Sequence, residues 1–259
     1  MRFEIPGPLP LLVVATAAVA ACSGGSTSPA GMGRVAFQIA TTATSSSNGP
    51  AAADVVVSKG SNTVVVSQVQ LVARKIRFRR VDASCAEDPD QDRDEAENEA
   101  EEEECPVLKL GPLLLDPPLT AGAVTVFTAD VPVGTYSRIR LQIHKPRGDR
   151  DQAFLAANPT FSNVSIRVKG TFNGAPFTFD TAIEEEEEIA LSPPIVVTSD
   201  GTTAFTLFLD VRGWFLDQSG NALVDPTSPT SDIRRRIEQN IRTSFRAFRD
   251  EDRDGNEDD

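Results

Sequence analysis

The chain of 259 residues contains one His, one Trp, one Tyr and three Cys. A single His excludes a metal centre built from several imidazoles and gives little support to His-dependent catalysis. One Trp and one Tyr would make a poor stacking platform for sugars. The N-terminal apolar run from Leu9 to Ala21 is 13 residues long and contains Pro10, which is too short for a helix that spans a bilayer.

Acidic residues are unevenly placed in a chain whose formal net charge is -13. The segment between Cys85 and Cys105 carries a charge of -11, the run from Glu184 to Glu188 carries -5, and the tail from Asp250 to Asp259 carries -6. The remainder is therefore basic, with a charge of +9. Such blocks of like charge are typical of solvated segments. Basic charge alone would permit nucleic-acid binding, but the export signal described next argues against it, and no nucleic-acid partner is expected.

The first residues predict export. Arg2 precedes the apolar run, which ends in small residues as the core of a signal peptide does. The run closes on Val19-Ala20-Ala21-Cys22, which resembles the lipobox read by the signal peptidase of bacterial lipoproteins. The resemblance implies a signal peptide over residues 1–21 and acylation of Cys22. Ser23, rather than Asp, then favours the outer over the inner membrane. Residues 22–33 are rich in Ser and Gly and predict a flexible tether.

The predicted export bears on the state of the other two cysteines. In an exported chain with Cys22 acylated, Cys85 and Cys105 are expected to form one disulfide. An unstrained bridge of this span would contribute roughly 3 kcal/mol. It would close an acidic insertion over residues 86–104, for which two interpretations remain open. The insertion either collects cations or is a solvated loop without a ligand, and the second is favoured.

The body, residues 34–249, is expected to be one all-β domain, an antiparallel β-sandwich of about ten strands with one C-terminal amphipathic helix. Apolar residues alternate with polar ones in most segments, as in half-buried strands. Lys59-Gly60-Ser61-Asn62 and Phe172-Asn173-Gly174-Ala175 predict hairpin turns. A change of parity predicts a bulge near Arg74-Lys75. The run Glu184–Glu188 is expected at a sheet edge, where it would discourage aggregation.

One stretch carries a family resemblance. Pro132-Val133-Gly134-Thr135-Tyr136 continues into Ser137-Arg138-Ile139-Arg140-Leu141, and Gly33-Arg34-Val35 opens an earlier strand. Together they resemble a family of bacterial lipoproteins that share a domain of unknown function. The resemblance covers roughly residues 34–145 and implies no catalytic residues. Without any family, Tyr136 is predicted to form a structural corner, with its hydroxyl bonded to the backbone.

The C-terminal region predicts a helix followed by an ion-binding pattern. Ser231 or Asp232 can cap a helix over residues 231–249, in which one apolar stripe recurs (Ile233, Ile237, Ile241, Phe245 and Phe248). The tail over residues 250–259 then begins Asp-x-Asp-x-Asp-Gly, which matches the start of a calcium loop. The expected ligands are Asp250, Asp252, Asp254, Asn256 and Asp258. The bidentate Glu of an EF-hand is missing, so calcium binding would be weak, and a frayed acidic tail is an equally open interpretation.

The chain is accordingly predicted to be a lipid-anchored cell-envelope protein, a binding or scaffolding module rather than an enzyme, with calcium as its one candidate cofactor. Its expected partners are the membrane, through the anchor, and an envelope protein or glycan. A carboxylate-dependent hydrolase is one alternative, although few carboxylates such as Asp180 and Asp210 lie within strands. A carbohydrate-binding module is the other alternative.

Overall fold

The computed structural model describes residues 31–42, 54–81, 106–109, 111–148 and 150–258. In these ranges, twelve strands form one sheet, ordered β6-β1-β11-β12-β10-β7-β3-β8-β9, with β2, β4 and β5 also paired to β3. The strands are β1 (Met32–Thr41), β2 (Val55–Lys59), β3 (Asn62–Arg80), β4 (Val107–Lys109), β5 (Leu113–Leu115), β6 (Val124–Pro132), β7 (Gly134–Ile143), β8 (Ile166–Phe172), β9 (Ala175–Thr181), β10 (Glu185–Val197), β11 (Thr202–Leu209) and β12 (Phe245–Arg249).

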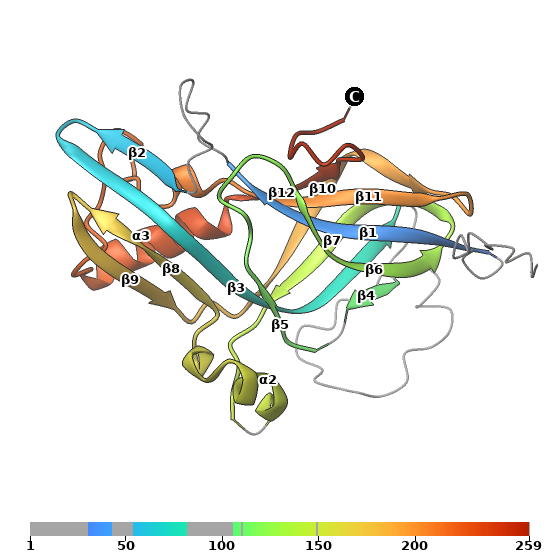
Figure 1. The fold of residues 1–259 in the computed structure, drawn as a ribbon, viewed down its shortest axis with the longest axis horizontal. Coiled ribbons are helices and arrows are strands. Elements are labelled where there is room, and N and C mark those ends of the chain that lie inside the picture. The colour runs from blue at the N-terminus through green and yellow to red at the C-terminus, as the bar shows by residue number, and fades with distance from the viewer. Residues whose placement is uncertain (1–30, 43–53, 82–105, 110, 149, 259) are drawn as a thin grey trace, which may run out of the picture.

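The described residues contain few helices, namely α2 (Gln152–Ala157), α3 (Ser231–Arg242) and the 3-10 turns η1 (Pro159–Phe161) and η2 (Val211–Gly213). Within the described ranges, none of the helices combines the length and the hydropathy that a membrane crossing needs. The short α2 lies below the sheet in the view of Figure 1, on the connection from β7 to β8.

The fold is all-β as predicted, but the prediction of an antiparallel sandwich is wrong. The strands curl into one mixed half-barrel (Figure 1), in which β1 pairs parallel to β11 and β10 pairs parallel to β12. Alternating apolar residues predict that one face of each strand is buried. They do not reveal whether that face packs against a second sheet or against the curled continuation of the same sheet.

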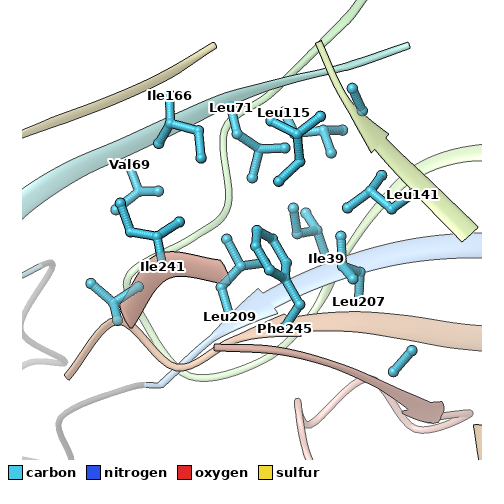
Figure 2. Close-up of a cluster of buried hydrophobic side chains, with 14 of the residues drawn as sticks. Ile39, Val69, Leu71, Leu115, Leu141, Ile166, Leu207, Leu209, Ile241 and Phe245 are labelled. Carbon is cyan, nitrogen blue, oxygen red and sulfur yellow. The ribbon is translucent and has the colours of Figure 1, made fainter. Parts of the chain in front are cut away.

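One core fills the inside of the curl. Figure 2 shows side chains from separate strands converging with α3: Ile39 of β1, Leu71 of β3, Leu141 of β7, Leu207 of β11 and Ile241 of α3. All five side chains are no more than 1% exposed. The helix therefore covers part of the concave face that a second sheet would cover in a sandwich.

The predicted C-terminal helix is too long. It ends at Arg242, and the Phe245–Arg249 segment is β12, which lies between β11 and β10. Phe245 and Phe248 fit a helical stripe, yet Phe245 and Ala247 also alternate as a strand and bury their side chains in the core. The backbone groups of β12 pair with β11, so sheet hydrogen bonding overrides the helical spacing. The N-cap is Thr230, whose hydroxyl accepts from the Ile233 amide at 3.3 Å, rather than Ser231 or Asp232.

Several local predictions are confirmed. Lys59 pairs with Asn62 and Phe172 with Ala175 across two-residue turns. The β3–β7 register shifts between Ala73 and Ile76, at the predicted bulge. The Tyr136 hydroxyl donates to the Pro132 carbonyl at 2.6 Å from a fully buried ring.

The run from Glu184 to Glu188 leads into β10. Residues Glu185 to Glu188 pair with β7 on one side, whereas the pairing of β10 with β12 is made at Leu191, beyond the run. The Glu188 carboxylate forms ion pairs with Arg138, with Arg140 at 3.0 Å and with Arg79 at 3.5 Å. Opposite charges on neighbouring strands therefore offset the charge of Glu188 within the row of acids.

Candidate metal centre

The segment after β12 folds back over the sheet. Asp250 follows the last residue of β12, and residues 250–258 form a closed loop, drawn in dark red near the C-terminus in Figure 1. The loop closes where the Asp258 amide donates to the Arg249 carbonyl at 3.0 Å. It is tied to the β6 side of the sheet by a hydrogen bond from the Ala123 amide to the Arg253 carbonyl, also at 3.0 Å. The acidic tail is therefore an ordered loop on the fold.

Three of the five predicted ligands meet in this loop. Asp250, Asp252 and Asp254 each place one carboxylate oxygen within 4.8 Å of the others. Asp252 and Asp254 are exposed, whereas Asp250 is fully buried. Three oxygen ligands at this spacing, from one buried and two accessible acids, suit a hard cation such as Ca²⁺.

Asp250 is held by the sheet as well as by the loop. Its Oδ2 accepts from the Thr206 hydroxyl at 3.0 Å and from the Gly255 amide at 3.2 Å. Its Oδ1 is buried and has no hydrogen-bond partner within the geometric limits of a hydrogen bond among the described residues. Burial raises the pKa of Asp250 above its ordinary value, and the Thr206 hydroxyl with the backbone amides of Gly255 and Arg253 only partly opposes this effect. The neighbouring charge of Asp254 adds to the rise.

Local backbone geometry brings the acids together. The Asp252 carboxylate accepts from the Asp254 amide at 3.1 Å, and the Asp254 carboxylate accepts from the Asn256 amide at 2.7 Å. These side-chain turns curl the chain in successive steps. Gly255 has a φ of +83°, a conformation that L side chains rarely adopt. The Gly predicted to permit the sharp turn therefore does so.

Of the other two predicted ligands, Asp258 makes a different contact, whereas a side-chain role for Asn256 stays a prediction. The Asp258 carboxylate accepts from the Glu251 amide at 2.6 Å and closes the loop, so it does not join the three acids. Asn256 contributes its backbone amide to Asp254, as described above. The lipidation residue Cys22 and the disulfide pair Cys85 and Cys105 lie outside the described residues, as does the acidic insertion 86–104.

Two residues next to the cluster were missed by the sequence analysis. Gln38 of β1 pairs in register with Thr206 of β11, and both are fully buried. The Thr206 hydroxyl lies 3.1 Å from Gln38 Oε1. In the sequence these two residues occupy the polar positions of strands in which polar and apolar residues alternate, and this pattern predicts that they are exposed. The C-terminal loop covers them, and their burial could not be predicted without knowing that this distant segment returns over the sheet.

A cavity of about 520 Å³ opens beside the loop, over the seam between β12 and β10. Gly255, Asn256 and Glu257 of the loop form part of its lining, together with Phe208 and Phe248. The two rings lie 5.9 Å apart, and the Arg246 guanidinium lies over the Phe208 ring at 4.9 Å. The conformation of the loop therefore shapes this cavity.

The two carboxylates named for a possible hydrolase, Asp180 and Asp210, form hydrogen bonds and ion pairs within the protein. The Asp180 carboxylate forms a bidentate pair with Arg167 at 2.7 and 2.8 Å. Asp210 accepts from the Thr42 hydroxyl at 2.9 Å and from the side chain of Arg212 at 3.2 Å. Burial acts to raise the pKa of Asp210, but these hydrogen bonds outweigh it, and the pKa lies below its ordinary value. Asp210 is thus stabilised as an anion, and the Asp180 carboxylate is engaged by Arg167.

Comparison of the chain with protein-family models, with curated proteins and with solved structures finds no match. The resemblance to a lipoprotein family therefore stays a prediction, and the function is argued from the site alone.

Proposed function

We propose that the protein is a lipid-anchored, non-catalytic module of the bacterial cell envelope that binds Ca²⁺ at Asp250, Asp252 and Asp254. The single observation that carries the calcium site is the Asp250 carboxylate. One of its oxygens is buried without a hydrogen-bond donor, in a side chain that lies beside two further carboxylates. A buried oxygen without a partner is costly, and a cation at the cluster would remove that cost.

The bound ion would have a structural role. Asp250 is attached to β11 through Thr206, whereas Asp252 and Asp254 belong to the loop alone. A cation held by all three would fix the loop to the outside of the sheet and define one wall of the neighbouring cavity. Only three acids are gathered and two are exposed, so the dissociation constant is expected at about 10⁻⁴–10⁻³ M, the range of extracellular modules.

The internal pairing of the two acids named above as hydrolase candidates supports a module over a hydrolase. General acid catalysis needs a carboxyl group whose pKa is raised towards the working pH. Asp180 of β9 is instead paired with Arg167, and Asp210, which caps η2 just after β11 rather than lying within a strand as predicted, is paired with Arg212. Trp214 and Tyr136 are fully buried, so neither ring offers a surface on which a sugar could stack.

Calcium titration of the full-length chain, stripped with EDTA, tests the site. We expect one weak binding event by calorimetry in the wild type, and its loss in Asp252→Asn and Asp254→Asn. The matched control is Asp225→Asn, an exposed acid whose carboxylate accepts from its own turn at Thr227. Identical isotherms for wild type and the cluster variants would refute the site.

The anchor is tested separately, because its residues lie outside the described ranges. We expect the wild-type chain to fractionate with membranes and to incorporate labelled palmitate, and Cys22→Ser to lose both properties. A wild-type chain recovered entirely as unacylated protein in the soluble fraction would contradict the anchor and leave the calcium site unaffected.

A further inference from the structure

The Thr206 hydroxyl lies between two side chains that each present an oxygen to it. Its hydroxyl is within bonding distance of two acceptors, Gln38 Oε1 at 3.1 Å and Asp250 Oδ2 at 3.0 Å. A hydroxyl carries a single hydrogen and can donate to only one of them. Two bare oxygens facing the same hydroxyl would leave one contact repulsive in a fully buried place.

The side-chain amide nitrogen of Gln38 also needs a hydrogen-bond acceptor. Its Nε2 is buried and without a partner, while its Oε1 faces the Thr206 hydroxyl. The nitrogen and oxygen of a side-chain amide are interchangeable by a half-turn and are assigned from the hydrogen-bond network. A half-turn of the Gln38 amide places Nε2 next to the Thr206 hydroxyl. Nε2 then donates to the hydroxyl oxygen, and the hydroxyl donates to Asp250 Oδ2.

A cation at the cluster fixes the direction of the chain of donors. With a cation bound, Asp250 is ionised, and both of its oxygens only accept hydrogen bonds. Thr206 must then donate to Asp250 Oδ2, which leaves its own lone pair to accept from a donor. In the described part of the chain, Gln38 is the side chain recorded on the other side of that hydroxyl.

We infer that Gln38 is a positioning residue of the cation site, with its amide nitrogen donating to the Thr206 hydroxyl, which in turn donates to Asp250 Oδ2. The inference rests on the proposed calcium site and adds two residues to it, from β1 and β11. The relay holds one carboxylate oxygen of Asp250 against the sheet and leaves Oδ1 for the ion. Donors in such a chain polarise one another, so the hydrogen bond to the carboxylate is strengthened.

The register of the sheet makes this relay specific. Gln38 and Thr206 are direct partners across the parallel β1–β11 pair, and Phe248 of β12 lies opposite Thr206 on the other side. Asp250 follows Phe248 by two residues. The relay therefore runs across three neighbouring strands to the first residue of the loop, and it links the position of the ion to the register of the sheet.

Calcium affinity in four variants of the full-length chain tests the inference. Thr206→Val is close in shape and lacks the hydroxyl, and Gln38→Met is close in length and lacks the amide. We expect each to raise the calcium dissociation constant about tenfold, because each removes one hydrogen bond from the relay that holds the Asp250 carboxylate, and tenfold corresponds to about 1.4 kcal/mol. Thr206→Ser keeps the hydroxyl and is expected to bind within about twofold of wild type. Gln70→Met, at a partly buried glutamine bonded to Asp116, is the matched control and should leave affinity unchanged.

The outcomes separate the inference from the function on which it rests. A wild-type chain that binds no Ca²⁺ would overturn both. Calcium binding that is lost in Asp252→Asn but unchanged in Gln38→Met or Thr206→Val would overturn the relay alone. Weakening that Thr206→Ser shares with Thr206→Val would also overturn it. So would weakening accompanied by a changed circular dichroism spectrum in EDTA, since damage to the fold would then explain the loss.

Discussion

His144 Nε2 lies 2.8 Å from Asp151 Oδ2, and both side chains are almost completely buried. The only His of the chain is thus a structural residue, which joins the end of β7 to the start of α2. The same oxygen of Asp151 accepts from the Arg147 amide at 2.8 Å. The turn between β7 and α2 is therefore organised around one carboxylate.

This carboxylate gives a prediction about pH. Burial acts to raise the pKa of Asp151, but the hydrogen bonds from Arg147 and His144 outweigh it, and the pKa lies below its ordinary value. A carboxyl group with a lowered pKa in the folded state stabilises the fold above its unfolded pKa, about 3.9, and loses this contribution as the pH falls through the folded value. We expect Asp151→Asn to be destabilised at pH 7 by about 1–3 kcal/mol. The deficit should shrink below about pH 4, as measured by urea unfolding. A deficit that is independent of pH from 7 to 3 would contradict this account.

The Glu188 cluster predicts a dependence on salt. Glu188 is partly exposed and pairs with Arg79, Arg138 and Arg140 on neighbouring strands. Glu188→Gln would leave three guanidinium groups close together, so we expect a loss of about 1–2 kcal/mol in the free energy of unfolding at low salt. Because salt screens repulsion between exposed charges, the loss should diminish at 1 M NaCl.

Glu186→Gln is the control for that variant, since Glu186 has a single recorded partner, Arg140, at 3.7 Å. It should lose less than about 0.5 kcal/mol. Equal losses for the two variants would show that the network around Glu188 contributes nothing beyond an ordinary surface pair.

The sequence predicts much of the local structure, because short-range chemistry determines it. The turn at Asn173 and Gly174 needs two residues that tolerate positive φ, and these have φ of 52° and 83°. Tyr136 reaches a carbonyl only four residues away. The gathering of Asp250, Asp252 and Asp254 likewise follows from their spacing, since each turn in the loop joins residues two apart.

What the sequence does not predict depends on partners far along the chain. The Phe245–Arg249 segment forms a strand because its backbone groups pair with β11 and β10, between which it lies. Gln38 and Thr206, 168 residues apart, become buried only because the C-terminal loop returns over them. Glu188 pairs with Arg79 of β3 and with Arg138 and Arg140 of β7, and no local pattern identifies that pairing.

Tyr136 is the only Tyr of the chain, so its ionisation can be followed without interference. Burial raises its pKa to about 12, and the nearby charge of Arg80 opposes this only in part. The neutral phenol is favoured by the fold, so this contribution to stability is complete below the unfolded pKa, about 10, and is lost as the pH rises towards the folded value. We expect absorbance at about 295 nm to show no phenolate in the folded protein at pH 10.5. Half-ionisation there, with native circular dichroism, would contradict the buried corner. Tyr136→Phe should lose about 1 kcal/mol through the missing bond to Pro132.

Gly170 lies where β8 passes a register shift of β3, and its position predicts the most damaging single substitution outside the core. A Cβ at this residue would come within 1.9 Å of the Val65 carbonyl oxygen, a backbone atom that cannot rotate away. The register of the β3–β8 pair shifts between Val66 and Gln68, beside this contact. Gly170→Ala therefore requires the two strands to separate, and we expect a loss of more than about 3 kcal/mol in the free energy of unfolding.

Gly148→Ala is the control, because its Cβ would meet no atom within 4 Å and its φ is not in the left-handed region. That variant should be within about 0.5 kcal/mol of wild type, or slightly more stable. Chemical denaturation of both variants measures the difference, and equal stabilities would mean that β3 and β8 do not approach each other at Gly170.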